Sequence, residues 1–115
     1  MHELSIITNI FDILEQVAEE NRLIRITRVK LNIGKLQQIV PDMLSFAFET
    51  VAKGTKAEGA QLAVEELPIT MQCQTCRTEF LVEKQTFICP DCSGTALHML
   101  QGMEILLESV EGEQA

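Results

Sequence analysis

The stretch MQCQTCRTEFLVEKQTFICPDCSGTA, residues 71–96, contains all four cysteines of this 115-residue chain. They form two pairs, Cys73-Gln-Thr-Cys76 and Cys89-Pro-Asp-Cys92, with twelve residues between the pairs. Two CxxC pairs at about this spacing are typical of a four-cysteine zinc ribbon, in which each pair turns around one tetrahedral metal ion. Four thiolates complete the coordination shell, so the predicted site is structural and leaves no position for a substrate.

Iron is the alternative metal, because tetrahedral sulfur ligation also suits a rubredoxin-like electron carrier. Zinc is favoured because the short chain has no motif for a redox partner. His98, six residues after Cys92, is a candidate replacement or supporting ligand, although four cysteines already suffice. The apolar residues of the insert are expected to pack beneath the metal loops; they are Phe80, Val82, Phe87 and Ile88.

The cysteine stretch has little helical periodicity and lies between two segments of alternating apolar residues, 61–70 and 103–110. It is therefore expected to be an insertion between two strands of one sheet. An insert of about 25 residues buries too little apolar surface to fold alone, so metal binding should supply most of its folding free energy.

The rest of the chain shows two amphipathic helices and one further strand. Apolar residues recur at steps of three and four from Leu4 to Ala18, and they alternate with polar residues from Thr27 to Ile33, before Gly34. A second helix is predicted to start near Pro41, a residue suited to a first turn, and to end near Gly54.

These elements predict an α+β fold with two helices packed on a three-stranded, largely antiparallel sheet and an inserted zinc-ribbon-like module. The expected organisation is the first part of an α+β domain over residues 1–70, a zinc-binding four-cysteine module over 71–97, and the returning strand of the α+β domain with a tail over 98–115. The last residues, Glu111–Ala115, are expected to fray.

Composition narrows the function classes. Nine Lys and Arg against seventeen Asp and Glu give a formal charge of −8, which repels nucleic acid. The sequence has no signal-peptide pattern and no apolar run long enough to span a membrane, so a soluble cytoplasmic protein is expected. There is no GxxxxGK[ST] phosphate loop and no convergent catalytic group, so the chain is not expected to be an enzyme.

The amino terminus offers a second metal site. His2 places an imidazole beside the α-amino group of Met1, and the backbone N–H groups of His2 and Glu3 can complete a compact chelate if a metal displaces their protons. Ni²⁺ and Cu²⁺ favour such planar nitrogen coordination, whereas Zn²⁺ has no planar preference. The alternative is that His2 and Glu3 only precede a helix, with Glu3 complementing the helix dipole.

Met1-His2-Glu3-Leu4-Ser5 at the start, together with Cys73-x-x-Cys76 and Cys89-Pro-x-Cys92, resembles the HypA/HybF family of hydrogenase nickel-insertion proteins over essentially the whole chain. The resemblance implies a Ni²⁺ site on Met1, His2 and Glu3, with the His2 side chain as the essential ligand. It also implies structural Zn²⁺ on the four cysteines. In some relatives histidines lie beside the CxxC pairs, whereas Arg77 and Ser93 follow the pairs here. A metal or pH response that depends on such histidines is therefore not expected in this protein.

The resemblance further implies that the protein acts with a nickel-handling, HypB-like GTPase. It would deliver nickel to the large subunit of [NiFe] hydrogenase, or to urease in some relatives, as a monomer or homodimer. The alternative reading is a zinc-ribbon adaptor that binds other proteins and has no nickel function.

Overall fold

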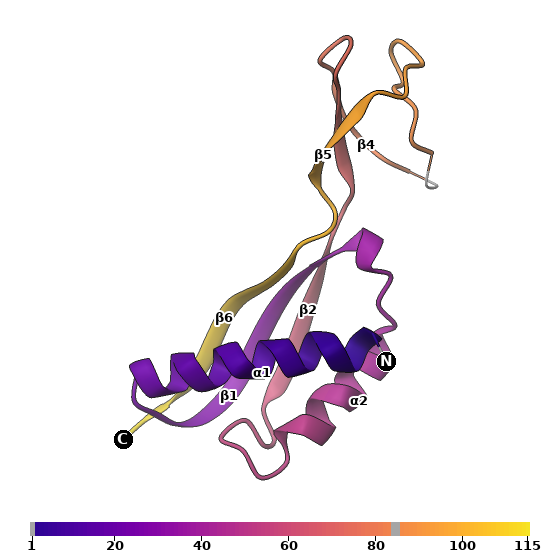
Figure 1. Ribbon diagram of the computed structural model, residues 1–115. Helices are drawn as coiled ribbons and strands as arrows, with labels where there is room; N and C mark the ends of the chain where they lie inside the picture. The colour runs from indigo at the N-terminus through magenta and orange to yellow at the C-terminus, as the bar shows by residue number, and fades with distance from the viewer. Residues whose placement is uncertain (1, 84–85) are drawn as a thin grey trace. The chain divides into compact units, whose positions relative to one another are not determined.

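The computed structural model describes residues 2–83 and 86–115. Contacts divide the chain into two compact units, each drawn in Figure 1. Unit 1 comprises residues 1–32, 39–65 and 105–115, and unit 2 comprises residues 33–38 and 66–104. The polypeptide therefore passes from one unit to the other four times, and each unit is described separately.

Unit 1 contains both helices. Helix α1 spans His2–Glu20 and contains the predicted periodic stretch from Leu4 to Ala18, and helix α2 spans Pro41–Ala52 as predicted from Pro41. Apolar side chains at steps of three and four give each helix one buried face. The helices pack against each other through Phe11 and Phe48, whose ring centroids lie 5.4 Å apart.

The sheet of unit 1 has the strand order β2-β1-β6. Its strands are β1 (Leu23–Gly34), β2 (Gln61–Leu67) and β6 (Ile105–Gln114). Figure 1 shows α1 lying across one face of this sheet, β6 running opposite to β1, and β2 running in the same direction as β1 after the crossover through α2. The core lies between this face and the helices, so the two helices and three strands of the prediction are confirmed.

The other face of this sheet carries a group of ion pairs. Lys30 Nζ lies 3.0 Å from a carboxylate oxygen of Glu108 on β6 and 3.7 Å from one of Glu65 on β2. The hydrogen bond to Glu108 raises the pKa of Lys30. Because Lys30 lies on the central strand, these side chains connect all three strands on the exposed face.

The carboxyl end corrects one prediction. Residues 111–115 were expected to fray, but β6 extends to Gln114. Thr27 Oγ1 donates to the Glu111 carbonyl oxygen, and the Ala115 N–H donates to the Arg22 carbonyl oxygen. These hydrogen bonds to the amino-terminal half hold a segment whose Glu, Gly and Gln residues have little strand propensity of their own.

Unit 2 has its own three-stranded antiparallel sheet, in the order β4-β3-β5. The strands are β3 (Thr70–Cys73), β4 (Glu79–Leu81) and β5 (Leu97–Gln101). A small cluster of Ile69, Met71 and Val82 is buried beside the sheet, with Leu36, Phe80, Leu97 and Met99 packed partly against it. This core is far smaller than that of unit 1.

Two predicted boundaries differ from the structure. The single strand expected over residues 61–70 is divided into β2 and β3, which Pro68 separates because proline has no N–H to donate to a ladder. The predicted module 71–97 lies within a larger unit, because β5 pairs with β3 and the N–H of Gly34 donates to the Glu104 carbonyl oxygen at 2.7 Å.

The insert's apolar residues were expected to pack together beneath the metal loops. Val82 is buried and Phe80 packs against the cluster, but Phe87 and Ile88 are 37% and 47% exposed. That part of the prediction is wrong for Phe87 and Ile88, since the cluster is completed by Leu36 and Met99 from distant parts of the sequence. In the part of the chain that the structure describes, no helix combines the length and the apolar character needed to span a bilayer.

Candidate metal sites

The two CxxC loops have the same backbone hydrogen bonding. The N–H of Arg77 donates to the Cys73 carbonyl oxygen, and the N–H of Ser93 donates to that of Cys89, each at 2.9 Å. Arg77 and Ser93 both adopt left-handed backbone conformations, with φ of 67° and 60°. Each loop therefore folds tightly back after its second cysteine, which directs both sulfur atoms of a pair to the same side.

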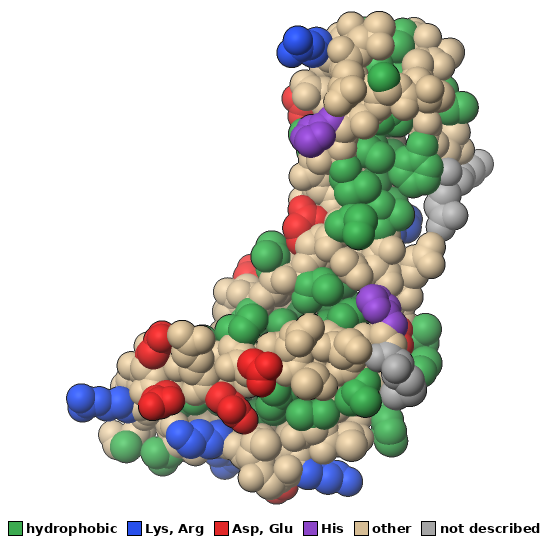
Figure 2. Space-filling model, in the orientation of Figure 1, with side chains coloured by type: hydrophobic (Ala, Val, Ile, Leu, Met, Phe, Trp, Pro, Cys, Tyr) green, Lys and Arg blue, Asp and Glu red, His purple; other side chains and the backbone are tan. Residues whose placement is uncertain are grey.

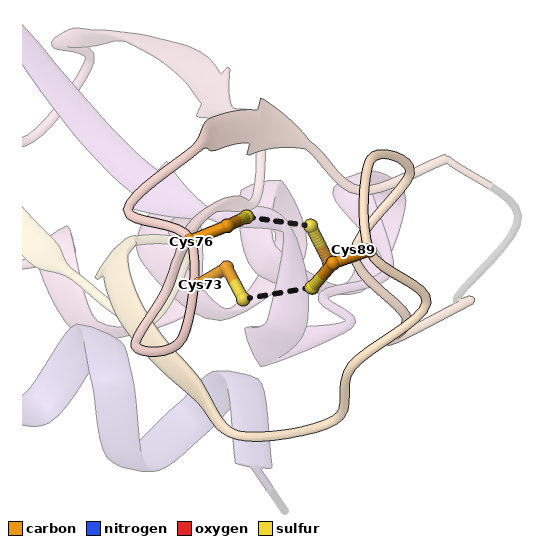
Figure 3. Close-up of side chains that lie close together, drawn as sticks. Cys73, Cys76 and Cys89 are labelled. Atoms are coloured by element: carbon orange, nitrogen blue, oxygen red, sulfur yellow. Dashed lines mark hydrogen bonds between the residues drawn. The ribbon is translucent and has the colours of Figure 1, made fainter.

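The two loops bring the four sulfur atoms together (Figure 3). Sγ of Cys73 lies 3.5 Å from Sγ of Cys92, and Sγ of Cys76 lies 3.5 Å from Sγ of Cys89. All four sulfurs lie within 4.8 Å of one another. Zn–S bonds of about 2.3 Å at tetrahedral angles place sulfur atoms roughly 3.8 Å apart. The cluster therefore has the size of a tetrahedral Zn²⁺ site, and the predicted grouping of the four cysteines is confirmed.

The thiols of the cluster share hydrogen bonds, and the pKa values of Cys73 and Cys92 are shifted in opposite directions. The backbone N–H of Cys76 lowers the pKa of Cys73 to about 6. The backbone N–H of Gly94 lowers the pKa of Cys92, but hydrogen bonding with Cys73 and Cys89 outweighs it and raises the pKa to about 12. Since one thiolate is stabilised by its neighbours' protons, a divalent cation at the centre would replace those protons.

Two polar residues that sequence reasoning missed support the cluster. The thiol of Cys76 donates to Thr78 Oγ1 at 3.2 Å, and the Thr78 hydroxyl donates to a carboxylate oxygen of Asp91 at 2.8 Å. Thr78 follows the first pair and Asp91 lies inside the second, so this bond ties one metal loop to the other. In the sequence, only the closeness of Thr78 and Asp91 to the cysteines could have indicated this role.

His98 lies on β5, where its backbone is paired with Gln72 of β3. Among the described residues, the group able to hold a metal consists of the four cysteines alone. The role considered for His98 as a replacement ligand is therefore not supported by the geometry.

At the amino terminus, α1 begins at His2, whose side chain is exposed. Met1, the third residue of the predicted nickel site, lies outside the described residues. The first four N–H groups of an α-helix have no intrahelical acceptor, and His2 and Glu3 fall in this first turn. The regular hydrogen bonds between successive helical turns therefore do not use the backbone nitrogens named in the prediction.

Glu3 is only 6% exposed. Its Oε2 accepts the N–H of Val40 at 3.0 Å, immediately before α2 begins at Pro41. The N–H of Val40, followed by that of Glu3 itself, lowers the pKa of the Glu3 carboxyl group. The carboxylate therefore fastens the start of α1 to the start of α2, and Val40 is a residue that sequence reasoning missed, because 37 positions separate it from Glu3.

We expect Glu3→Gln to lower the thermal midpoint of unit 1, because the neutral amide is a weaker acceptor than the carboxylate. The folded pKa lies below the ordinary value of 4.5, so the carboxylate stabilises the fold above about pH 4.5. This contribution disappears as the pH falls through the folded pKa. The difference in thermal midpoint between Glu3→Gln and the unmodified protein should therefore be largest at neutral pH and disappear in acid.

Helical circular dichroism measures this effect in unit 1 alone, since both helices belong to it. The matched control is Glu15→Gln, which removes an exposed carboxylate from the same helix. A deficit that is equally large for both variants, or independent of pH, would contradict the role assigned to Glu3.

Comparison with known proteins places this arrangement in a family. The model of the family described as "Hydrogenase/urease nickel incorporation, metallochaperone, hypA" matches residues 1–112. A hydrogenase maturation factor HypA from Desulfitobacterium hafniense is 40% identical over 114 residues, which are 99% of this chain and 100% of that protein. Another from Picosynechococcus sp. is 40% identical over 111 residues, 96% of this chain and 98% of that protein.

Solved structures agree in fold. A solution structure of HypA protein matches with a TM-score of 0.75 at 25% identity, covering 100% of this chain and 98% of that one. The solution structure of the Ni metallochaperone HypA from Helicobacter pylori matches with a TM-score of 0.74 at 24% identity and full coverage of both chains. The family model and the curated relatives both span almost the whole sequence, and this chain therefore belongs to the HypA family of hydrogenase nickel-incorporation metallochaperones.

Proposed function

We propose that this metallochaperone binds Ni²⁺ at its amino terminus, through nitrogen atoms of Met1, His2 and Glu3, and delivers it to [NiFe] hydrogenase during maturation. Membership of the family makes the chain a carrier and not an enzyme, as predicted. The observation that carries the proposal is the exposed imidazole of His2 on the first turn of α1, beside the backbone nitrogens of His2 and Glu3.

The contacts of Glu3 and the exposure of His2 support different roles for the two residues in nickel binding. The Glu3 carboxylate is buried and accepts the Val40 N–H, so Glu3 would contribute its backbone nitrogen to nickel and not its side chain. The His2 imidazole would be the one side-chain ligand. Nickel bound by amide nitrogens must displace their protons, and reprotonation of these amides provides a route for release to an acceptor.

The four cysteines would hold Zn²⁺ as a structural ion, because their sulfurs fit a closed tetrahedral shell. We further propose that the carrier works in the cytoplasm with a nickel-handling GTPase and the hydrogenase large subunit. The family description also includes urease, which is a second candidate recipient.

The test is an absorption titration with Ni²⁺ of untagged, zinc-loaded protein, beside a variant that has one extra residue before Met1. The proposal expects a planar-nickel band at one equivalent in the native-terminus protein only, because the extension displaces the α-amino group from the chelate. Equal binding by both proteins, or binding by neither, would favour the zinc-ribbon adaptor instead.

A further inference from the structure

Several large apolar side chains of unit 1 lie at the surface near the start of both helices. They are Leu4, Val40, Met43 and Phe46, with exposed fractions of 39%, 47%, 40% and 68%. We call these four residues the Phe46 patch. Scattered exposed apolar residues are ordinary, but a group of them beside one another marks an interaction surface.

The backbone places the members of the patch close together. Met43 and Phe46 are three residues apart on α2 and therefore share one helix face. Val40 immediately precedes this helix, and its N–H is bound by Glu3, the residue before Leu4. The face is not needed by the core, because α2 buries Leu44, Ala47, Phe48 and Ala52 instead.

The helices around this patch carry charge of one sign only. Across α1 and α2 there is no Lys or Arg, and all but one of the acidic residues are exposed. The exposed ones are Asp12, Glu15, Glu19, Glu20, Asp42 and Glu49. Figure 2 shows acidic side chains gathered over the carboxyl-terminal half of α1.

Part of this charge opposes the stability of α1. Glu19 and Glu20 lie in its last turn, where the helix dipole favours cations, and that turn has no basic residue. These two carboxylates therefore lower the stability of α1 in the unbound protein, and a cationic partner would offset this destabilisation.

We propose that the Phe46 patch and the carboxylates that flank it on α2, Asp42 and Glu49, form a docking surface for a basic amphipathic helix of a different protein. The apolar side of such a helix would cover Phe46 and Met43, and its Lys and Arg would face these two carboxylates. A second copy of this chain does not fit, because a symmetric interface would bring two sets of carboxylates together. The formal charge of −8 on each copy adds to that repulsion.

The Phe46 patch lies near the proposed nickel ligands, and its role in nickel delivery rests on the proposed function. Leu4 lies in the first turn of α1, as do His2 and Glu3, so a partner docked on the patch would be held beside the nickel ligands. The docking itself is independent of nickel and can be tested without it.

The experiment uses two synthetic helical peptides of equal length with the same leucine face, one carrying lysine and the other glutamate at the remaining positions. Each is titrated into isotopically labelled, zinc-loaded, full-length protein while the backbone amide resonances are followed. The lysine peptide is expected to bind saturably, to shift the resonances of the Phe46 patch, and to weaken as salt is raised. The glutamate peptide should not bind.

Phe46→Ser should reduce the affinity of the protein for the lysine peptide about tenfold to a hundredfold, because a phenyl group is no longer buried on binding. Ile24→Ser is the matched control, since Ile24 on β1 is 57% exposed but does not belong to the patch. Both variants should bind Ni²⁺ as the unmodified protein does. Failure of the nickel titration alone would therefore overturn the proposed function and leave the docking surface intact.

Several results would overturn the docking proposal. They are absence of saturable binding, equal binding of both peptides, unchanged affinity of Phe46→Ser, and shifts concentrated away from the patch. Sedimentation of the free protein completes the test: a dimer that dissociates on Phe46→Ser would show that the occupant is a second copy.

Discussion

His2→Ala should abolish stoichiometric Ni²⁺ binding while leaving the fold and the zinc content unchanged. The imidazole would be the one side-chain ligand in a chelate otherwise made of terminal and backbone nitrogens, so no neighbouring side chain can replace it. Loss of a direct ligand should reduce affinity by more than the roughly 10- to 100-fold that follows when a group supporting a ligand is lost. The His2 side chain is exposed, so its removal costs no core packing.

Equilibrium titration with Ni²⁺ measures this effect, with helical circular dichroism and zinc analysis as checks on the fold. The matched control is His98→Ala, which removes the other histidine of the sequence from a position on β5 outside the cysteine cluster. We expect His98→Ala to retain one equivalent of nickel. Unchanged affinity in His2→Ala, or an equal loss in both variants, would refute the amino-terminal site.

Removal of zinc should unfold unit 2 and leave unit 1 folded. Among the described residues of unit 2, the buried apolar cluster consists of Ile69, Met71 and Val82, which is too little apolar surface to offset the conformational entropy of the unit. Structural zinc supplies about 10–16 kcal/mol of apparent binding free energy in small zinc-binding peptides. Unit 1 has an independent core between its helices and sheet, so its stability does not depend on the metal.

Amide hydrogen exchange with and without a strong chelator measures the two units separately. The amides of β3 and β5 should lose protection, and those of α1 and α2 should keep it. Cys89→Ser should reproduce the effect of the chelator, because Cys89 is a buried member of the cysteine cluster. The control Ser93→Gly should retain zinc, since glycine readily adopts the left-handed conformation at this position, where φ is 60°. Retained protection of β3 and β5 in the metal-free protein would contradict this account.

The cysteine site could be predicted almost completely from the sequence. Two CxxC pairs at ribbon spacing require that four thiolates meet, and the structure places all four sulfurs within 4.8 Å of one another. The hydrogen bond between Thr78 and Asp91 could not be predicted from the same pattern, because it depends on how the two loops face each other.

The role of the Glu3 carboxylate illustrates the limit of local reasoning. The sequence placed Glu3 beside a potential nickel ligand and at the positive end of a helix dipole. Neither argument identifies Val40 as its hydrogen-bond partner, since the contact exists only after α1 and α2 have packed. The assignment of nickel to Met1, His2 and Glu3 stays a prediction that the titrations above will test.

By itself the sequence determined the two amphipathic helices, the central strand and the metal module, because each is encoded by side-chain periodicity or ligand spacing over a few adjacent residues. Tertiary structure alone decided that residues 111–114 form an ordered strand, that Leu36 and Met99 complete the core of unit 2, and that Glu3 is buried. These features depend on partners tens of residues away, and hydrogen bonding or burial by a distant segment outweighs the weak local preferences that a sequence displays.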